Sequence, residues 1–403
     1  MDLTSGYPFW PAKNGFLKTY EPLDRSLACE VLVLGGGITG ACIARSLVED
    51  GRDVVVLDRR NFGWGSTCGS TALLMYEIDT HLRDLIRETG QGLAVAAYRS
   101  GLEAIEKVEG LCRTLGAGEF RRRDSVYFAS TVADGEILQD EFETRREFGL
   151  PVEWISSEDF SRQFDFPAPG AIRSRVAAEI DAFQLTHALL ADGERRGARL
   201  FARTEATECH EREDRLLVKT DRGPEICCGH VVVACGFESL KYLRRSVPVR
   251  LTSSFALASE PIRDFAGWPD RCLLWESARP YCYARTTSDG RGLLGGEDVP
   301  FQNALARDAL LPAKVERLER RWRALFPRIP LELAFPWTGT FAETGDGLPY
   351  IGFPSEQPRA FFALCYGGNG ITYSVLAAEM LRAALRSERH PYADVYSFDR
   401  KKA

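Results

Sequence analysis

A glycine-rich turn between an apolar run and a helical segment is the feature that most constrains the fold. Residues 30–34 are mostly apolar, the turn Gly-Gly-Gly-Ile-Thr-Gly occupies residues 35–40, residues 41–50 have helical periodicity, and residues 54–57 form a second apolar run. Strand, glycine turn, helix and strand within about thirty residues are typical of a parallel βαβ unit with a right-handed crossover. The sequence therefore predicts that a doubly wound α/β sheet begins here.

The turn also has the spacing of a dinucleotide-binding site. Gly35 permits a tight turn, Gly37 leaves room for a pyrophosphate against the backbone, and the helix N-terminus supplies N–H donors. Asp58 ends the second apolar run, where a carboxylate accepts hydrogen bonds from ribose hydroxyls and repels a 2′-phosphate. A glycine turn with only a structural role is the alternative, and the accompanying strand, helix and acid disfavour it. The predicted contacts are Gly35, Gly37, Ile38, Thr39, Gly40, Asp58, Arg59 and Arg60.

A second loop of small residues, residues 63–71, follows directly after Asp58-Arg59-Arg60. Its backbone and hydroxyl donors suit a cofactor that continues from the pyrophosphate to a ring, which favours FAD over NAD. An ordinary polar loop is the alternative, and the position right after the acid disfavours it. The predicted contacts in this loop are Gly65, Ser66, Thr67, Ser70 and Thr71.

Composition narrows the class of protein. A chain of 403 residues with 45% hydrophobic and 27% charged residues is expected to bury a large core in two domains. The net charge of -6 favours small-molecule chemistry over nucleic acid or anionic lipid. We expect no metal site, no membrane span and no secretory signal, hence a cytoplasmic protein, and the 11 cysteines fit a reducing compartment. The adjacent Cys227 and Cys228 are a redox pair or, as we favour, the two faces of a strand.

The rest of the chain departs from simple strand–helix alternation. Helices are predicted over residues 91–115, 131–148, 181–196, 313–326 and 371–385, and strands over 124–130, 199–202, 215–220, 230–234, 249–260, 271–276, 281–287, 291–296 and 331–341. The strands from 249 to 296 are spaced like an antiparallel meander. The chain is therefore expected to cross between two domains several times. The predicted division gives residues 1–90, 151–236 and 336–403 to a cofactor domain, and residues 91–150 and 237–335 to a substrate domain.

Five motifs together resemble the D-amino-acid oxidase superfamily of FAD enzymes. They are the GGGITG turn with Asp58, the GWGST loop from Gly63, the segment from Tyr283 to Arg285, GDGLPYIG from Gly345 and YGGNGIT from Tyr366. The resemblance covers nearly the whole chain and is nearest to the glycine oxidase, sarcosine oxidase and γ-glutamylputrescine oxidase branch. It implies an α/β protein, α+β overall, with a Rossmann-like FAD domain interleaved with an antiparallel substrate domain. It also implies hydride transfer to FAD from a C–N bond of a small amine or amino acid.

The resemblance carries roles to further positions. Residues set against the flavin are Gly345, Asp346, Gly347, Leu348, Gly367, Gly368, Asn369, Gly370, Ile371 and Thr372, with Ala234, Cys235 and Gly236 in a flavin-side turn and Ala206 at the adenine. Glycines that only cap the last helix are the alternative at the C-terminal segment. No cysteine lies between Trp337 and Gly347, where some relatives attach flavin, so FAD is expected to be non-covalent. Residues 292–296 lack the lysine that sarcosine oxidases place there. The expected electron acceptor is therefore either oxygen or another molecule.

The predicted catalytic residues are Arg285, Tyr283 and Trp275. Arg285 is the candidate anchor for a substrate carboxylate, and a structural ion pair is its alternative. Tyr283 and Trp275 are candidate aromatic walls for an amine, or core residues. Tyr76, Glu77 and Asp79 follow the cofactor loop and are candidates to face the pocket, although for Glu77 and Asp79 we favour a solvated loop. Competing functions are a flavin hydroxylase that uses NAD(P)H and a nucleotide-binding protein without turnover.

Overall fold

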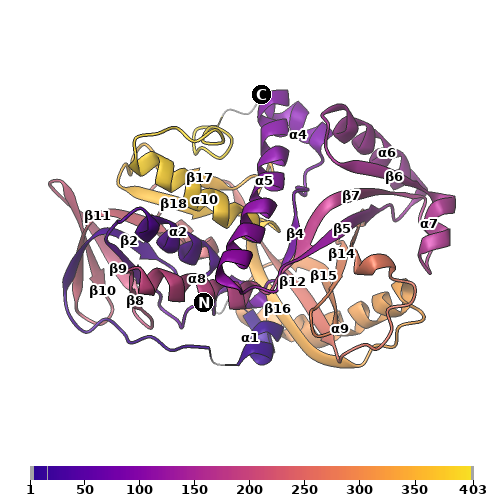
Figure 1. The fold of residues 1–403 in the computed structure, drawn as a ribbon, viewed down its shortest axis with the longest axis horizontal. Helices are drawn as coiled ribbons and strands as arrows, with labels where there is room; N and C mark the ends of the chain where they lie inside the picture. Colours follow the sequence, from indigo (N-terminus) through magenta and orange to yellow (C-terminus); the bar gives the residue numbers. More distant parts are fainter. Residues whose placement is uncertain (1–3, 16, 401–403) are drawn as a thin grey trace.

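The smaller of two sheets has a parallel centre, as the βαβ pattern predicts. The computed structural model describes residues 4–15 and 17–400. Strand order is β17-β18-β11-β2-β3-β8, with β10 paired to β11 and β9 to β10 (Figure 1). Neighbours from β18 to β8 run parallel, and β17 is antiparallel at the edge. The bounds are β2 Leu27–Leu34, β3 Val54–Leu57, β8 Arg199–Phe201, β9 Ala206–Arg212, β10 Arg215–Thr220, β11 Glu225–Val233, β17 Tyr350–Gly352 and β18 Ala360–Leu364.

Helices pack against this sheet around α2 (Ile38–Glu49), which begins directly after the glycine turn. It starts three residues before the predicted helix because the extended Gly37 precedes a helical Ile38. Gly40 is required for packing, since a Cβ there would lie 1.8 Å from the carbonyl oxygen of Gly35. The neighbouring helices are α8 (Ala182–Arg195), α10 (Gly370–Leu385) and α5 (Gln91–Leu115), the last two of which contact each other.

The larger sheet is mostly antiparallel and contains the predicted meander. Its order is β1-β16-β12-β15-β14-β13-β5-β7-β4, with β6 paired to β7, and β13 is parallel to β5. The bounds are β1 Thr4–Gly6, β4 Leu73–Met75, β5 Arg121–Phe128, β6 Val152–Ser156, β7 Gly170–Glu179, β12 Val249–Ser259, β13 Leu273–Glu276, β14 Cys282–Thr286, β15 Gly292–Pro300 and β16 Leu333–Thr344. Figure 1 shows this sheet on the opposite side of α5 from β8–β11.

The helices attached to the larger sheet differ most from the sequence expectation. The helix α9 (Ala304–Leu325) begins nine residues before the predicted one, because Asn303 accepts a hydrogen bond from the Ala306 N–H and Pro312 is accommodated inside the helix. The remaining helices are α1 Phe9–Asn14, α3 Ser66–Gly69, α4 Leu82–Thr89, α6 Val132–Glu147 and α7 Ser157–Gln163, with short 3-10 turns at Gly236–Tyr242 and Pro269–Arg271. None of the helices in the described ranges has the length and apolar character needed to cross a membrane.

The chain passes repeatedly from one sheet to the other. Residues 27–57, 199–233 and 350–364 supply the smaller sheet, whereas residues 73–179 and 249–344 supply the larger one. Residues 151–236 were assigned to the cofactor domain, but β6 and β7 in this range belong to the larger sheet. Residues 91–150 were assigned to the substrate domain, but their first helix, α5, contacts α8 and α10. Cys227 and Cys228 are free thiols on β11, Cys228 buried and Cys227 half-buried.

Candidate active site

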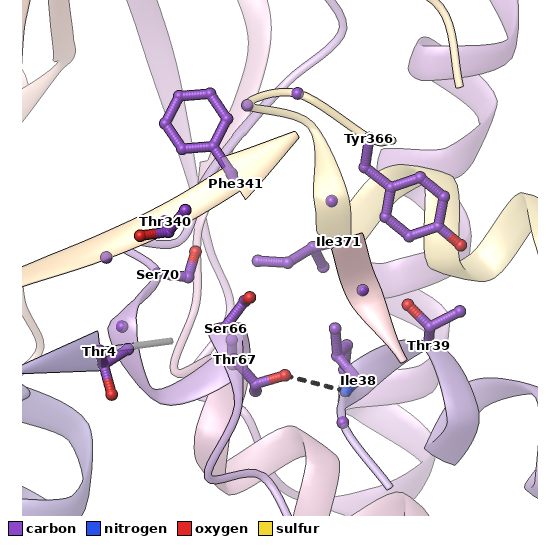
Figure 2. A pocket seen from close by; sticks show the side chains of 18 of the residues that line it. Thr4, Ile38, Thr39, Ser66, Thr67, Ser70, Thr340, Phe341, Tyr366 and Ile371 are labelled. Carbon is purple, nitrogen blue, oxygen red and sulfur yellow. Dashed lines mark hydrogen bonds between the residues drawn. The ribbon is translucent and has the colours of Figure 1, made fainter. Parts of the chain in front are cut away.

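A cavity of about 300 Å³ lies where the two sheets meet and extends from the start of α2 to the meander. Figure 2 shows the part between the α2 N-terminus and the loop before α10. Of the predicted site residues, those that line the cavity are Gly35, Gly37, Ile38, Thr39, Asp58, Arg59, Arg60, Ser66, Thr67, Ser70, Thr71, Ala206, Ala234, Cys235, Gly236, Trp275, Tyr283, Gly367, Gly368, Asn369, Gly370 and Ile371. The structure thus brings together residues from both ends of the chain.

The glycine turn and the second loop form one end of the cavity. Thr67 Oγ1 accepts a hydrogen bond from the Ile38 N–H at 3.0 Å, drawn as a dashed line in Figure 2, and so joins α3 to the first turn of α2. A Cβ at Gly37 would meet only this Thr67 oxygen, at 3.0 Å, and would otherwise occupy the cavity. Gly40 and Gly65 do not line it; Gly40 packs against Gly35, and Gly65 precedes α3. The open helix N-terminus suits a pyrophosphate.

Asp58 is held rigidly at the carboxyl end of β3. Its carboxylate accepts hydrogen bonds from the Gly36 N–H at 2.8 Å and the Arg60 N–H at 2.7 Å. Burial nevertheless raises the pKa of Asp58 to about 6. Asp58 lines the cavity, and its contact with ribose hydroxyls stays a prediction.

Lys241 and Tyr242 extend this end of the cavity and were missed by sequence reasoning. The Tyr242 hydroxyl donates to the carbonyl of Ala206 at 2.9 Å, and Lys241 pairs with Glu205. Both follow the predicted flavin-side turn at residues 234–236 on the same 3-10 helix, which is the signal that would have found them.

The loop before α10 lines the middle of the cavity. The Gly367 N–H donates to the Ala342 carbonyl at 3.0 Å, and Asn369 Nδ2 donates to the Glu77 carbonyl at 2.7 Å, which joins this loop to the segment after β4. Thr372 is buried outside the lining, and its hydroxyl donates to the Asn369 carbonyl at 2.9 Å. The cavity is also lined by Gly339, Thr340 and Phe341 of β16, which precede the predicted flavin contacts at residues 345–348.

The predicted flavin contacts Gly345, Asp346, Gly347 and Leu348 do not line the cavity, which corrects their placement. Asp346 accepts hydrogen bonds from the Leu348 N–H at 3.1 Å and the Thr344 hydroxyl at 2.9 Å, and pairs with Arg400 at 2.9 Å. Although burial opposes it, the Arg400 guanidinium holds the pKa of Asp346 below its usual range. The segment is a turn that anchors the C-terminal residues.

Aromatic residues of the meander form the far end of the cavity. Trp275 is 3% exposed and stacks on Tyr127 with ring centroids 3.6 Å apart, while its Nε1 donates to Ser125 Oγ at 3.0 Å. The Tyr283 hydroxyl lies 3.3 Å from Ser254 Oγ. Both rings serve as packing and as cavity wall, so the two alternatives considered for them coexist.

Arg285 does not reach the cavity, which corrects its placement as a substrate anchor. It is 2% exposed, and its guanidinium donates to the carbonyls of Ala72 at 2.6 Å, Ile180 at 2.8 Å and Thr286 at 2.8 Å. These bonds tie β14 to the segment after the second loop. A side chain with this many carbonyl partners has a structural role.

Glu77, Asp79 and Asp298 line the cavity instead; the sequence analysis favoured solvent for the first two and did not consider Asp298. Asp79 lines the cavity rather than a solvated loop, and Asp298 of β15 lines it beside Tyr281. Glu77, also expected in solvent, is 4% exposed, and its Oε1 lies 3.9 Å from Arg145 Nη1. Burial raises the pKa of both Glu77 and Asp79.

Asp298 gives the stability of the protein a testable pH dependence. Burial raises its pKa to about 7, above the unfolded value of about 3.9, so the folded state holds a proton that the unfolded state releases across this range. The contribution of Asp298 to the free energy of unfolding therefore falls as the pH rises from about 4 to about 7. Asp298→Asn is expected to raise the Tm of FAD-loaded protein by roughly 2–4 °C at pH 8 and by little at pH 4.

The control is Asp289→Asn, because hydrogen bonds from Thr287 and Arg291 lower the pKa of Asp289 despite its burial. That carboxylate contributes stability above the unfolded pKa, so the control is expected to lower the Tm at pH 8. Scanning calorimetry from pH 4 to pH 8 measures both. A Tm difference for Asp298→Asn that does not change with pH contradicts the prediction.

The residues present fit FAD: an open helix N-terminus, a ribose carboxylate and a glycine loop share one cavity.

The family model of FAD dependent oxidoreductases (DAO) matches residues 30–384. Glycine oxidase of Bacillus subtilis (strain 168) is 21% identical over 387 residues, covering 93% of this chain and 98% of that protein. Gamma-glutamylputrescine oxidoreductase of Escherichia coli (strain K12) is 25% identical over 419 residues, covering 96% and 89%. The crystal structure of glycine oxidase from Geobacillus kaustophilus superposes with a TM-score of 0.76 at 20% identity, covering 93% and 99%. The chain therefore belongs to the DAO family of FAD-dependent oxidoreductases.

Proposed function

We propose that the protein oxidises the C–N bond of a small amine or amino acid by transferring a hydride from carbon to FAD. The observation that carries this proposal is the continuity of the cavity, which joins the dinucleotide turn at Gly35–Gly37 to an aromatic chamber at Trp275, Tyr281 and Tyr283. A substrate in that chamber lies against the same cavity as the cofactor. Among the described residues, no group of three or more His, Cys, Asp or Glu side chains is placed to hold a metal ion.

The chain's own residues have the tasks of orientation and of excluding water. FAD, when bound, accepts the hydride, and a neutral amine needs little acid–base help to release it. Trp275, Tyr281, Tyr283 and Phe341 supply apolar walls that fix a small amine and displace water. The substrate carbon loses a C–H bond, its electron pair leaves with the hydrogen, and the resulting iminium ion is hydrolysed by water.

We further propose that an acceptor other than oxygen takes the electrons. Strand β15 presents Gly292, Leu293, Leu294, Gly295 and Gly296 where the related sarcosine oxidases carry a lysine. Among the described residues that line the cavity Lys241 is the one lysine, and it pairs with Glu205 at the ribose end. Slow reaction of the reduced protein with air is therefore expected.

The test begins with the spectrum of the purified protein and the fate of the flavin on acid precipitation. Soluble FAD is expected, and the native protein is then mixed without oxygen with amines and amino acids until one bleaches the flavin. Readmission of air is expected to restore the colour slowly, and an added artificial acceptor is expected to restore it fast. Bleaching by NADH instead of amines would support the hydroxylase alternative, and absence of flavin would overturn the proposal.

The hydroxylase alternative has no support in the structure. Flavin hydroxylases use an Asp-Gly segment ahead of a helix, whereas Asp289-Gly290 lies in the turn between β14 and β15. In this turn the Thr287 N–H donates to the Arg291 carbonyl at 2.9 Å. A cytoplasmic location stays a prediction.

A further inference from the structure

A bulge in β15 turns one of two neighbouring acids into the cavity. Phe255 of β12 pairs with Gly296, but Ser253 pairs with Val299, so Glu297 and Asp298 together oppose Ser254. Glu297 has a φ of 59°, in the left-handed region that a glutamate rarely adopts. Bulges of this kind re-aim a side chain next to a functional site. As a result, Asp298 lines the cavity and the neighbouring Glu297 does not.

The two carboxylates have different surroundings. Glu297 contacts Lys314 of α9 on the side away from the cavity, with Nζ 3.0 Å from Oε2 and 2.7 Å from the Glu297 carbonyl. Asp298 lines the cavity, and its buried Oδ1 has no hydrogen-bond partner. A buried carboxylate oxygen without a donor is costly unless a ligand supplies one. The bulge therefore presents to the chamber a carboxyl group whose Oδ1 is left without a donor.

Asp79 places a second carboxylate in the same chamber. A Cβ on Gly368 would lie 3.8 Å from Asp79 Oδ2, so this carboxylate sits beside the glycine loop before α10. Burial raises the pKa of Tyr281 well above its usual value, and the nearby charges of Asp79 and Asp298 each raise it further. Asp79, Asp298 and the ring of Tyr281 therefore line the same cavity.

The cations that act on these two acids do not line the chamber: Arg279 and Arg250 lower the pKa of Asp79 and Lys314 lowers that of Asp298, but burial outweighs them. The cations that line the cavity are Arg59, Arg60 and Lys241, all at the ribose end and paired with Glu238 or Glu205. Arg285 is occupied by backbone carbonyls. Arg279, exposed at the rim over the ring of Tyr281, lowers the pKa of Asp79 but does not line the cavity. Among the described residues, this end of the cavity is thus lined by carboxyl groups and by no cation, which opposes a substrate carboxylate.

We propose that the substrate is a small aliphatic diamine whose distal ammonium binds Asp298, an inference that rests on the proposed function. Asp79 and the rings of Tyr281 and Tyr283 complete the site. Carboxylates with aromatic faces are the groups that recognise an alkylammonium. The proximal nitrogen is neutral when it reacts: its adjacent carbon gives a hydride to FAD, and water hydrolyses the iminium ion formed to an amino-aldehyde and ammonia. A neighbouring cation also offsets the charge of Asp79, which together with burial raises the pKa of Asp298.

The experiment compares three probes of the same length in anaerobic reduction of the FAD-loaded protein: 1,4-diaminobutane, butylamine and 4-aminobutanoate. The diamine is expected to reduce the flavin at least about 10-fold more efficiently than butylamine, and 4-aminobutanoate least of all. Asp298→Asn is expected to lose about 10–100-fold in efficiency with the diamine and to prefer it no longer. Glu297→Gln, the neighbouring acid outside the cavity, is the matched control and is expected to keep the preference.

A second readout does not depend on turnover. Tetramethylammonium, which has no neutral amine to oxidise, is expected to raise the Tm of the FAD-loaded wild type and of Glu297→Gln, and to leave that of Asp298→Asn unchanged. No Tm shift in the wild type overturns the diamine site whether or not amines reduce the flavin. Fastest reduction by a zwitterionic amino acid such as glycine also overturns it, while leaving the proposed function intact. Failure of every amine and amino acid to reduce bound FAD overturns the proposed function instead.

Discussion

Replacing Gly37 with valine is expected to give a folded protein that is colourless. The backbone at Gly37 has φ −79° and ψ −172°, which valine adopts without strain, and a Cβ there meets only Thr67 Oγ1 at 3.0 Å. The added methyl groups instead fill the cavity at the α2 N-terminus, where the pyrophosphate has to approach the backbone. We expect the affinity for FAD to fall by roughly 100-fold or more, about 2.7 kcal/mol.

Two other glycines provide the comparison. Gly110→Ala in α5 changes an open position with no atom within 4 Å of the new Cβ, and is expected to keep full flavin content. Gly40→Ala would set a Cβ 1.8 Å from the Gly35 carbonyl oxygen, so it is expected to lose the flavin together with the fold. Flavin absorbance and circular dichroism separate these cases. Full flavin content in Gly37→Val would show that the pyrophosphate does not approach this residue.

Arg145→Met is expected to lower the free energy of unfolding by about 3–5 kcal/mol. Arg145 is fully buried on α6, and its Nε donates to Glu141 Oε1 at 2.7 Å while Nη1 lies 3.9 Å from Glu77 Oε1. Glu141 in turn accepts from the Leu82 N–H at 2.8 Å at the start of α4. Methionine has a similar length but no charge, so it leaves two carboxylates buried without their cation.

Arg146→Met on the next position is the control, because Arg146 is exposed and its pair with Glu143 is on the surface. Its cost is expected to stay below about 1 kcal/mol. Adding Glu77→Gln to Arg145→Met removes one uncompensated charge and is expected to recover about 1–2 kcal/mol. Urea unfolding followed by circular dichroism measures all three. Equal stability of Arg145→Met and the wild type would mean that Glu77 and Glu141 are neutral in the folded protein.

The cofactor end of the site was predictable because its determinants are local in sequence. The turn at residues 35–40 and the acid at 58 are fixed by one βαβ unit, and the loop at 66–71 follows directly. The family match over residues 30–384 confirms the predicted FAD enzyme, and the two sheets confirm the mixed α/β class. Short-range spacing therefore carries the nucleotide site.

The substrate end was not predictable, because its side chains are oriented by long-range pairing. The register shift that turns Asp298 inward depends on how β12 meets β15: Gly295 and Gly296 inside the strand are compatible with a bulge but do not fix which side chain turns inward. Arg285 was misplaced for the same reason, since its carbonyl partners Ala72 and Ile180 lie far away in the sequence. Likewise, Asp346 was predicted at the flavin, but its partner Arg400 lies 54 positions further on. The sequence identified residue types but not the direction in which they point.

The repeated passage of the chain between the two sheets has a consequence for folding and for engineering. The cavity is lined by the segments in which the chain changes sheets, such as residues 57–73 and 233–249. Neither half is a continuous stretch that can be expressed alone or exchanged with that of a relative by a single fusion. Contacts between distant segments have to form before the cavity exists, which is typical of slow, high-contact-order folding. Flavin retention is thus a reporter of whole-molecule integrity, and loss of flavin and loss of secondary structure should coincide in one cooperative denaturation curve.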